Sequence, residues 1–595
     1  MSQTPAFIKK EGLFLLGLLA LGILAYKNSL RGPLIGDDQY TVVWNFAIRD
    51  LSQIGKIMTQ NLFAAAGTDT AYFRPITQLS FALDFNLWGF NPIGYRLTSL
   101  VIHMGNALLV YRLAQRLLPS VQSLLVSSVF IVHPVNMQAI AYISSRSDPL
   151  FFFFTLLSVK LWLTEKGLSR PFCLLSFLLG LLSKETAVVT LPLILLMDLA
   201  RSESYAGAKR RLQDNRLWYI GLAGILSAYL ALRVWILGYP LLMETGQVDF
   251  TLAQRLMLAL SLLGRHLILL LFPVNLAFIH MVVPPHDFFA PQVLGPLLTV
   301  IGLGYLALKL WKIERAVALG LAWFFIADVP ALNLTLLNLP LMESWLYLPG
   351  VGLFIFLVSL GGLAVRHKAI RILAACMTVI LLTMRATVRS ADWGSPVRLF
   401  EKNVQLYPGS DIAWSSLASA YVDAGRDKEA FEAARKVVEL RPDLWTSHFG
   451  LGLRYFWADE DRGAEQSFLT ASKLNPYVAW PRYLLGITYF RSGRWEKARE
   501  EFIKTSLGEP HIPMLYHLIG SCYLALGERG LAEEAFQRAL QEYPRKKDFH
   551  SNIHTDLGGS LKKRGLLAVA KQEYELALRF DPENKEAMEK LASLK

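Results

Sequence analysis

The chain has 595 residues, of which 53% are hydrophobic and 18% are charged, and its formal net charge is +13. A soluble protein of this length carries far more charge, so this composition excludes an entirely soluble chain. Much of the positive excess lies in short loops between apolar runs, as in membrane proteins, so we expect no nucleic-acid partner. The apolar runs end near Met384 and the chain is polar beyond Asp392, which predicts two domains, 1–391 in the lipid bilayer and 392–595 outside it.

Apolar runs that approach the ~20 residues of a membrane span recur along the first domain. They lie at 12–27, 95–117, 121–140, 149–165, 171–183, 186–200, 217–237, 292–311, 315–329, 345–364 and 369–384. These runs predict about eleven spans, with the basic loops on the cytoplasmic side. The loop 28–94, the segment 238–290 and the C-terminal domain then lie on the outer face. No small-x-small cleavage pattern follows the first run, so we expect an uncleaved first span.

The stretch 255–283 has two interpretations. It contains the apolar residues 267–272, which could belong to a twelfth span, but Arg265 and His266 precede them. Such polar side chains favour an interfacial or re-entrant helix. A twelfth span would also move the basic residues 309–315 to the outer face, so the eleven-span threading is preferred.

This threading gathers ionisable residues on the outer face, where the membrane makes them costly. The first outer loop contains two adjacent carboxylates, Asp37 and Asp38. The other candidates lie in later outer loops or near the outer ends of spans: Arg74, Arg96, His103, His133, Arg146, Asp148, Lys184, Glu185 and Glu343. Each alone has an ordinary explanation as a solvated turn, a structural ion pair or a headgroup contact. Together, carboxylates with Arg and Lys suit a phosphate-bearing lipid substrate, because both cations bind phosphate.

The second domain contains a sequence repeat. A proline recurs every 34 residues, with four extra residues before the last: Pro408, Pro442, Pro476, Pro510, Pro544 and Pro582. This period is the tetratricopeptide signature. We predict five repeats and a closing helix from about Asn584 to Leu594, forming a superhelix whose groove holds a protein partner. The alternative is an array that only braces the membrane domain, since fold does not determine function.

Short motifs in the first domain support a closer assignment. In chain order they are Asp37-Asp38, Phe73-Arg74-Pro75, Pro92-Ile93-Gly94-Tyr95-Arg96, Ile102-His103-Met104-Gly105-Asn106, His133-Pro134, Ser145-Arg146-Ser147-Asp148, Ser183-Lys184-Glu185 and Leu346-Tyr347-Leu348-Pro349. With the repeats behind them, the chain resembles the protein O-mannosyltransferases that join transmembrane and tetratricopeptide-repeat (TPR) regions and have the GT-C fold. It departs from that family where Ser344 and Trp345 follow Glu343 in place of an arginine. The short array resembles a compact, bacterial relative whose donor need not carry mannose.

The resemblance implies an all-α protein in the cytoplasmic (inner) membrane, with a GT-C helix bundle over 1–391 and an extracytoplasmic TPR domain over 392–595. It also implies a glycosyltransferase that uses a polyprenyl-phosphate-linked sugar. The acceptor would be a Ser or Thr hydroxyl of an exported protein held in the TPR groove. Attack by that hydroxyl on the anomeric carbon inverts its configuration, with a carboxylate as the base.

The residue roles are carried over from the same resemblance. Asp37 is expected to be the base, although the motif alone does not separate it from Asp38, which would orient the acceptor or bind a metal. Three cations are expected to bind the donor phosphate: Arg74, Arg146 and Lys184. The supporting residues are expected to be Arg96, His103, His133, Asp148, Glu185 and Glu343. Two adjacent carboxylates allow a divalent cation such as Mg²⁺ or Mn²⁺ without requiring one.

Two alternatives to this function stay open. The first is a transferase of the same class that moves an oligosaccharide, or that acts on a lipid or glycan acceptor. The second is a non-catalytic membrane-anchored scaffold that recruits secretion or pilus proteins through its repeats. A scaffold would tolerate loss of the outer-face carboxylates and cations, and a transferase would not.

Overall fold

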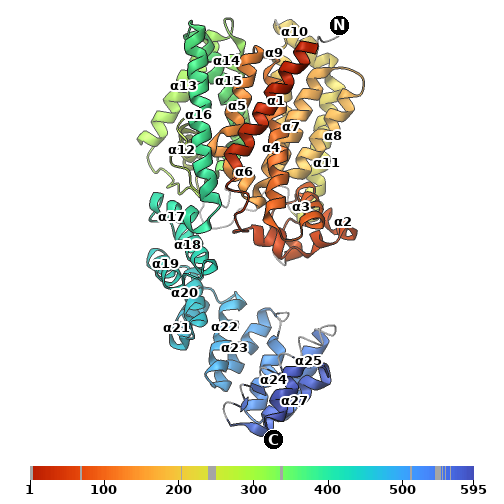
Figure 1. Cartoon of the computed structure of the whole chain (residues 1–595), viewed down its shortest axis with the longest axis vertical. Coiled ribbons are helices and arrows are strands. Elements are labelled where there is room, and N and C mark those ends of the chain that lie inside the picture. The colour runs from red at the N-terminus through yellow and green to blue at the C-terminus, as the bar shows by residue number, and fades with distance from the viewer. Residues whose placement is uncertain are drawn as a thin grey trace. The chain divides into compact units, whose positions relative to one another are not determined.

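The computed structural model in Figure 1 describes residues 5–594 except 67–69, 203, 239–249, 335–338, 510–511, 513, 543–550 and several positions between 552 and 564. Every regular element among the described residues is a helix, as the all-α prediction requires. Internal contacts divide the chain into two compact units, Met1–Pro408 and Gly409–Lys595.

The first unit is a bundle of mostly apolar helices (Figure 1). The helices that coincide with the predicted apolar runs or with the stretch 255–283 are α1 (Pro5–Tyr26), α4 (Pro92–Ala114), α5 (Ser120–Val132), the short α6 (Met137–Ala141), α7 (Ser147–Thr164), α8 (Ser169–Ser183), α9 (Thr190–Ala200), α11 (Arg216–Leu237), α12 (Leu252–Leu271), α13 (Pro291–Leu310), α14 (Arg315–Asp328), α15 (Tyr347–Ala364) and α16 (Lys368–Trp393). Each predicted apolar run corresponds to one of these helices or to the pair α5–α6. Six of the described helices are long and apolar enough to cross a membrane, or seven if α5 and α6, which meet at 46°, form one span. The unit is therefore a multi-pass membrane bundle.

The helix α12 covers the stretch for which the sequence allowed two interpretations. Its length and composition place it among the six helices able to cross a membrane. Near the start of α12, Arg255 donates a hydrogen bond to the Leu334 carbonyl. Near its end, the Leu270 carbonyl lies within hydrogen-bond distance of His133 Nε2. Leu334 follows α14 and His133 ends α5, and the predicted threading places both of these points on the outer face. Within that threading, these contacts fit the interfacial or re-entrant helix that the sequence analysis prefers to a twelfth span.

Close packing of α14 against α15 depends on two glycines. A Cβ at Gly320 would lie 2.6 Å from the Phe356 nitrogen, and a Cβ at Gly352 would lie 2.5 Å from the Phe324 nitrogen. Small residues let two membrane helices approach backbone to backbone. This contact holds the start of α15, and with it the preceding turn that contains Glu343.

Shorter elements connect the long helices. They include α2 (Ile54–Ile57), α3 (Pro75–Trp88), α10 (Tyr205–Asp214) and α17 (Pro396–Leu406). The helix α17 belongs to the first unit, whereas the sequence predicted a domain boundary after residue 391. The reason is that its Phe400 ring packs on Phe278 and its Asn403 bonds the backbone of the same loop, 272–290.

The second unit consists of paired helices. These are α18 (Asp411–Asp423), α19 (Asp427–Leu440), α20 (Trp445–Trp457), α21 (Asp461–Leu474), α22 (Ala479–Arg491), α23 (Trp495–Gly508), α24 (Leu515–Ala525), α25 (Arg529–Glu542), α27 (Leu567–Phe580) and the closing helix α28 (Lys585–Ala592). A Cβ at Gly486 would lie 2.5 Å from the Phe502 ring, and Gly520 meets Phe536 in the same way. The recurring small and aromatic positions are thus contacts between paired helices. Pro510, Pro544 and part of the helix before α27 lie outside the described residues.

Candidate active site

The turn that contains the paired carboxylates is shaped by Gly36. This residue has a φ of +52°, a conformation that glycine adopts without strain. A Cβ at this position would also lie 3.1 Å from the Tyr142 hydroxyl. The turn places the two neighbouring carboxylates in different surroundings, since Asp38 is fully buried whereas Asp37 is exposed.

The Asp38 carboxylate is bonded within the protein. It accepts from the Ser144 backbone N–H and hydroxyl at 2.8 Å each, and from the Ile35 N–H at 3.2 Å. Burial raises the pKa of Asp38 to about 6, although the Arg96 guanidinium and the bonds from Ser144 oppose this rise. Arg96 itself donates to the carbonyls of Gly32, Pro33 and Ala141. Asp38 and Arg96 therefore hold the turn in place.

Asp37 is the carboxylate that faces outward. Its backbone N–H donates to the Tyr142 hydroxyl at 2.9 Å. The side chain is accessible, yet desolvation by the surrounding protein raises its pKa above the ordinary aspartate value, and a hydrogen bond with Tyr142 opposes the rise. An accessible carboxylate with a raised pKa has the properties of a general base.

Two ion pairs lie at the same end of the bundle. Arg74 forms a bidentate ion pair with Glu185: Nη2 donates to Oε1 at 2.6 Å and Nε donates to Oε2 at 3.1 Å. Lys184 Nζ lies 2.5 Å from Asp148 Oδ1. Burial disfavours ionisation of Glu185, but Arg74 outweighs it and lowers the pKa of this carboxyl to about 2. The Arg74–Glu185 pair is thus charged at neutral pH.

Tyr72 connects these pairs to Asp37. The Arg74 guanidinium lies 4.4 Å from the centre of the Tyr72 ring. The charges of Arg74, Glu185, Asp37 and Arg233 all act on the Tyr72 hydroxyl. The structure therefore pairs four of the residues predicted for the site, Arg74 with Glu185 and Lys184 with Asp148, and a fifth, Asp37, acts electrostatically on the same tyrosine as the first pair.

Arg233 belongs to this cluster, and the sequence analysis did not identify it. It lies near the end of α11, is buried, and donates to the Ala71 carbonyl at 2.5 Å. Its Nε has no hydrogen-bond partner among the described residues. The available signal was an arginine inside an otherwise apolar helix, which marks a functional candidate.

Arg146 lies in the wall of the site. It is fully buried, pairs with Asp84 at 2.6 Å, and donates to the Tyr95 carbonyl at 2.6 Å and the Ser99 hydroxyl at 3.2 Å. Its guanidinium also lies 4.7 Å from the centre of the Phe81 ring. Its Nη1 donates to the Ser80 carbonyl at 3.3 Å, so all three guanidinium nitrogens have partners and the structure does not bring Arg146 to the accessible surface beside Asp37.

The two predicted histidines are also internal. His103 lies between the hydroxyls of Tyr26 at 3.1 Å and Tyr347 at 2.5 Å, so it joins α1, α4 and α15. His133 Nε2 lies 3.0 Å from the Leu270 carbonyl, which attaches α5 to the end of α12. Both side chains hold helices together and neither reaches the Asp37 turn.

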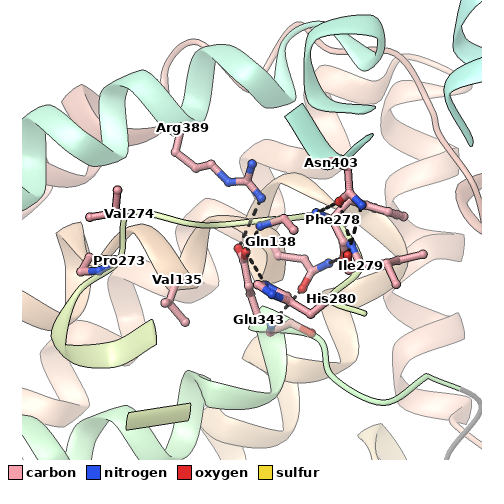
Figure 2. A network of polar contacts seen from close by, with 12 residues as sticks. Val135, Gln138, Pro273, Val274, Phe278, Ile279, His280, Glu343, Arg389 and Asn403 are labelled. Carbon is pink, nitrogen blue, oxygen red and sulfur yellow. Dashed lines mark hydrogen bonds and ion pairs between the residues drawn. The ribbon is translucent and has the colours of Figure 1, made fainter. Parts of the chain in front are cut away.

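Glu343 is at the centre of a second buried network, shown in Figure 2. Its Oε1 accepts from the Ala277 N–H at 2.5 Å and lies 3.1 Å from His280 Nε2. Its Oε2 lies 3.4 Å from an Arg389 nitrogen on α16. Gln138 reinforces the network because its amide nitrogen donates to the Phe278 carbonyl at 2.8 Å. The loop 272–290 is therefore fixed by buried polar groups.

Phe278 joins this network to the Asp37 turn. The Asn403 side-chain oxygen accepts from the N–H groups of Phe278 at 2.6 Å and Ile279 at 3.1 Å, as Figure 2 shows. The Phe278 ring meets the Tyr142 ring edge-on, with centroids 5.1 Å apart. Since Tyr142 bonds the Asp37 backbone, a continuous set of contacts runs from α17 to the candidate base.

The paired carboxylates do not fit a divalent cation held between them. Asp38 accepts hydrogen bonds from three N–H or O–H groups, and the positive Arg96 acts on it directly. A metal at Asp38 would have to displace those donors, so the arrangement leaves Asp37 alone as a possible ligand.

Comparison with known proteins finds matches to the repeats and relatives of most of the chain. Tetratricopeptide repeat models match residues 412–444 and 464–547. The protein O-mannosyl-transferase F38B6.6 of Caenorhabditis elegans is 25% identical over 452 residues, covering 72% of this chain and 63% of the relative. The protein O-mannosyl-transferase TMTC4 of Homo sapiens is 25% identical over 476 residues, covering 69% and 64%. These findings confirm the predicted resemblance, and the chain spans somewhat less than two thirds of these relatives.

Solved structures of other proteins match about a quarter to a third of the chain. A crystal structure of MamA is 28% identical and covers 28% of this chain and 95% of that chain, with a TM-score of 0.25. The TPR protein YrrB is 16% identical and covers 32% of this chain, with a TM-score of 0.27. Scores this low support no closer structural comparison.

Proposed function

We propose that this chain, a relative of the protein O-mannosyltransferases that carry transmembrane and tetratricopeptide-repeat regions, is an integral-membrane glycosyltransferase that acts on exported proteins. The observation that supports this most is an accessible carboxylate, Asp37, whose charge acts on the same Tyr72 hydroxyl as the charges of Arg74 and Glu185. A base and a phosphate-binding group at one end of a membrane bundle are what sugar transfer from a lipid phosphate requires. The donor class itself follows from the family resemblance.

In the proposed reaction, Asp37 takes the proton of a Ser or Thr hydroxyl of the acceptor. The hydroxyl oxygen bonds to the anomeric carbon, the bond from that carbon to the phosphate oxygen breaks, and the configuration inverts. The polyprenyl phosphate leaves with the electron pair of the broken bond. Arg74 and Lys184 stabilise the charge that develops on the phosphate, because preorganised cations act strongly in a site shielded from water.

The partners of these cations have a supporting role. Glu185 and Asp148 hold Arg74 and Lys184 at fixed positions, and Lys184 uses one of its three N–H groups on Asp148. Arg233 adds a third buried positive charge that acts on Glu185. Asp38 and Arg96 orient the turn that presents Asp37. Arg146 contributes by fixing α3 to α4, which makes it a positioning residue in this proposal.

The TPR domain is proposed to present the protein acceptor. Arrays of this kind form a concave surface that binds extended or helical segments of other proteins. The proposal places the Asp37 end of the bundle and the TPR domain on the extracytoplasmic face of the inner membrane, where an exported acceptor is available.

The test is a transfer assay with the purified full chain in proteoliposomes. Three donors are compared, a polyprenyl-monophosphate-linked hexose, a nucleotide-linked hexose and a lipid-diphosphate-linked oligosaccharide, with an extracytoplasmic protein fraction as acceptor. We expect protein labelling only with the monophosphate donor. Labelling from the oligosaccharide alone would support the first alternative, and no labelling of protein, lipid or glycan from any donor would support the scaffold.

A further inference from the structure

Three side chains that commonly bind transition metals meet inside the second unit. His517 lies on α24, His554 on the helical segment before α27, and Glu573 on α27. His517 Nε2 lies 3.4 Å from His554 Nδ1, and His554 Nδ1 lies 2.7 Å from Glu573 Oε2. One ligand atom from each residue lies within 4.8 Å of the other two, and all three side chains are buried.

The repeat pattern makes this cluster unusual. Counting back 34 residues at a time, His517 occupies the position of Tyr483 and Phe449, and the 38-residue spacing puts Glu573 at the position of Ala535. The next repeat back has Glu501 at the Glu573 position, but that carboxylate is partly exposed and pairs with Lys504 at 2.9 Å, whereas Glu573 is fully buried beside a histidine. A fully buried carboxylate costs free energy unless a positive charge or hydrogen bonds compensate it.

The surroundings leave the carboxylate with unused binding capacity. Glu573 Oε2 lies against His554, whereas Oε1 is buried and has no hydrogen-bond partner among the described residues. Aromatic rings enclose the two imidazoles, with Phe536 centred 5.3 Å from His517 and Phe580 stacked on His554 at 5.4 Å. A buried carboxylate beside two imidazoles in an apolar shell is a suitable environment for a cation.

We propose that His517, His554 and Glu573 form a structural zinc site in the TPR domain, with water or a further protein atom as the fourth ligand. Two histidines and one carboxylate are a ligand set that Zn²⁺ uses, with metal–ligand distances of about 2.0–2.2 Å. Tetrahedral geometry then separates ligand atoms by about 3.3 Å, close to the 3.4 Å between the two imidazole nitrogens. Zinc would replace the proton between His554 and Glu573 and widen their 2.7 Å contact.

The site would connect two consecutive repeats. His517 belongs to the fourth pair of helices, while His554 and Glu573 belong to the fifth pair. Stability in a repeat array depends on the interfaces between neighbouring repeats. A zinc ion at this interface would therefore stabilise the C-terminal end of the array, independently of whether the membrane unit transfers sugar.

The test uses the full chain, purified in detergent with an affinity tag that contains no histidine. The protein is exposed to Zn²⁺, passed through a desalting column, and its zinc content is measured by elemental mass spectrometry. We expect about one zinc ion per chain. The variant Glu573→Gln removes the charge and keeps the volume, so its zinc affinity is expected to fall by about 100-fold or more. His448→Gln is the matched control, because His448 is an exposed histidine bonded to the Pro442 carbonyl in an earlier repeat.

Substitution with Co²⁺ gives a readout that does not depend on stability. A tetrahedral site with nitrogen and oxygen ligands produces visible cobalt absorption bands, which Glu573→Gln should lose and His448→Gln should keep. Circular dichroism confirms that each variant is folded. A wild-type chain that retains no zinc after desalting would overturn the proposal. Equal zinc content in wild type and Glu573→Gln, with unchanged cobalt bands, would show adventitious binding only and would overturn it too.

Discussion

The ion pair between Arg74 and Glu185 gives a quantitative prediction for stability. The substitution Glu185→Gln keeps the size of the side chain but leaves the Arg74 guanidinium without its charged partner. The two side chains are only 11% and 20% exposed, so solvent screens the pair weakly. Breaking a buried pair by removing one partner costs about 3–5 kcal/mol, because an uncompensated charge stays buried.

The pKa of Glu185 gives an independent magnitude. This pKa falls from 4.5 to about 2 in the folded protein. A tenfold change in a proton-binding constant corresponds to about 1.4 kcal/mol, so the pair contributes about 3 kcal/mol at pH 7. Because the folded pKa is depressed, this contribution is complete above the unfolded value near 4.5 and is lost as pH falls toward 2. At pH 3, less than half of it should remain, on the order of 1 kcal/mol.

The assay is thermal unfolding of the full chain in detergent at pH 7 and pH 3. We expect Glu185→Gln to melt several degrees below wild type at pH 7, with a much smaller difference at pH 3. Glu165→Gln is the control, because Glu165 pairs with the partly exposed Arg201 and Arg211 and should change stability by less than about 1 kcal/mol. Equal melting of Glu185→Gln and wild type at pH 7, or a difference independent of pH, would refute the reasoning.

Three further predictions concern the rate of transfer. Arg74→Lys keeps the positive charge but loses the bidentate hydrogen bonding to Glu185 and to phosphate, so we expect the transfer rate in the proteoliposome assay to fall about 10-fold or more. An unchanged rate would show that Arg74 does not bind the donor. Asn403→Ala leaves the buried N–H groups of Phe278 and Ile279 without their acceptor, which should cost about 1–3 kcal/mol and slow transfer, whereas Asn403→Asp should preserve both properties better. Desolvation raises the pKa of Asp37, so the base should become protonated, and transfer should slow, at a pH above the usual aspartate pKa of about 3.9. A transfer rate that stays constant as the pH falls to about 3.9 would contradict the role of Asp37 as the base.

The helices of this protein were predictable because their signals are local. Apolar runs identified most long helices of the membrane unit but not α3, α10 or α17, and the 34-residue period located the paired helices of the second unit. The helix α12 was ambiguous for the same reason, since length and composition alone do not distinguish a span from a re-entrant helix. Contacts between its ends and distant loops, such as Arg255 with Leu334, are not visible in any local pattern.

The sequence predicted many residues of the candidate site, but not which of them are accessible and which are buried. Arg74, Lys184 and their carboxylate partners were named from motifs, and the structure places them together. The sequence could not separate Asp37 from Asp38, because the difference is made by Ser144, more than one hundred positions away. The burial of Arg146 in the wall depends in the same way on its distant partner Asp84, which no local pattern indicates.

The central claim is that Asp37 is the base of a sugar transferase acting on exported proteins. The most direct test is the intact mass of exported proteins from cells with the wild-type gene, without it, and with Asp37→Asn at equal membrane abundance. The account predicts a hexose-sized mass that is present with wild type and missing from both of the other samples. Persistence of this mass with Asp37→Asn, or no mass difference between any of the three samples, would contradict it.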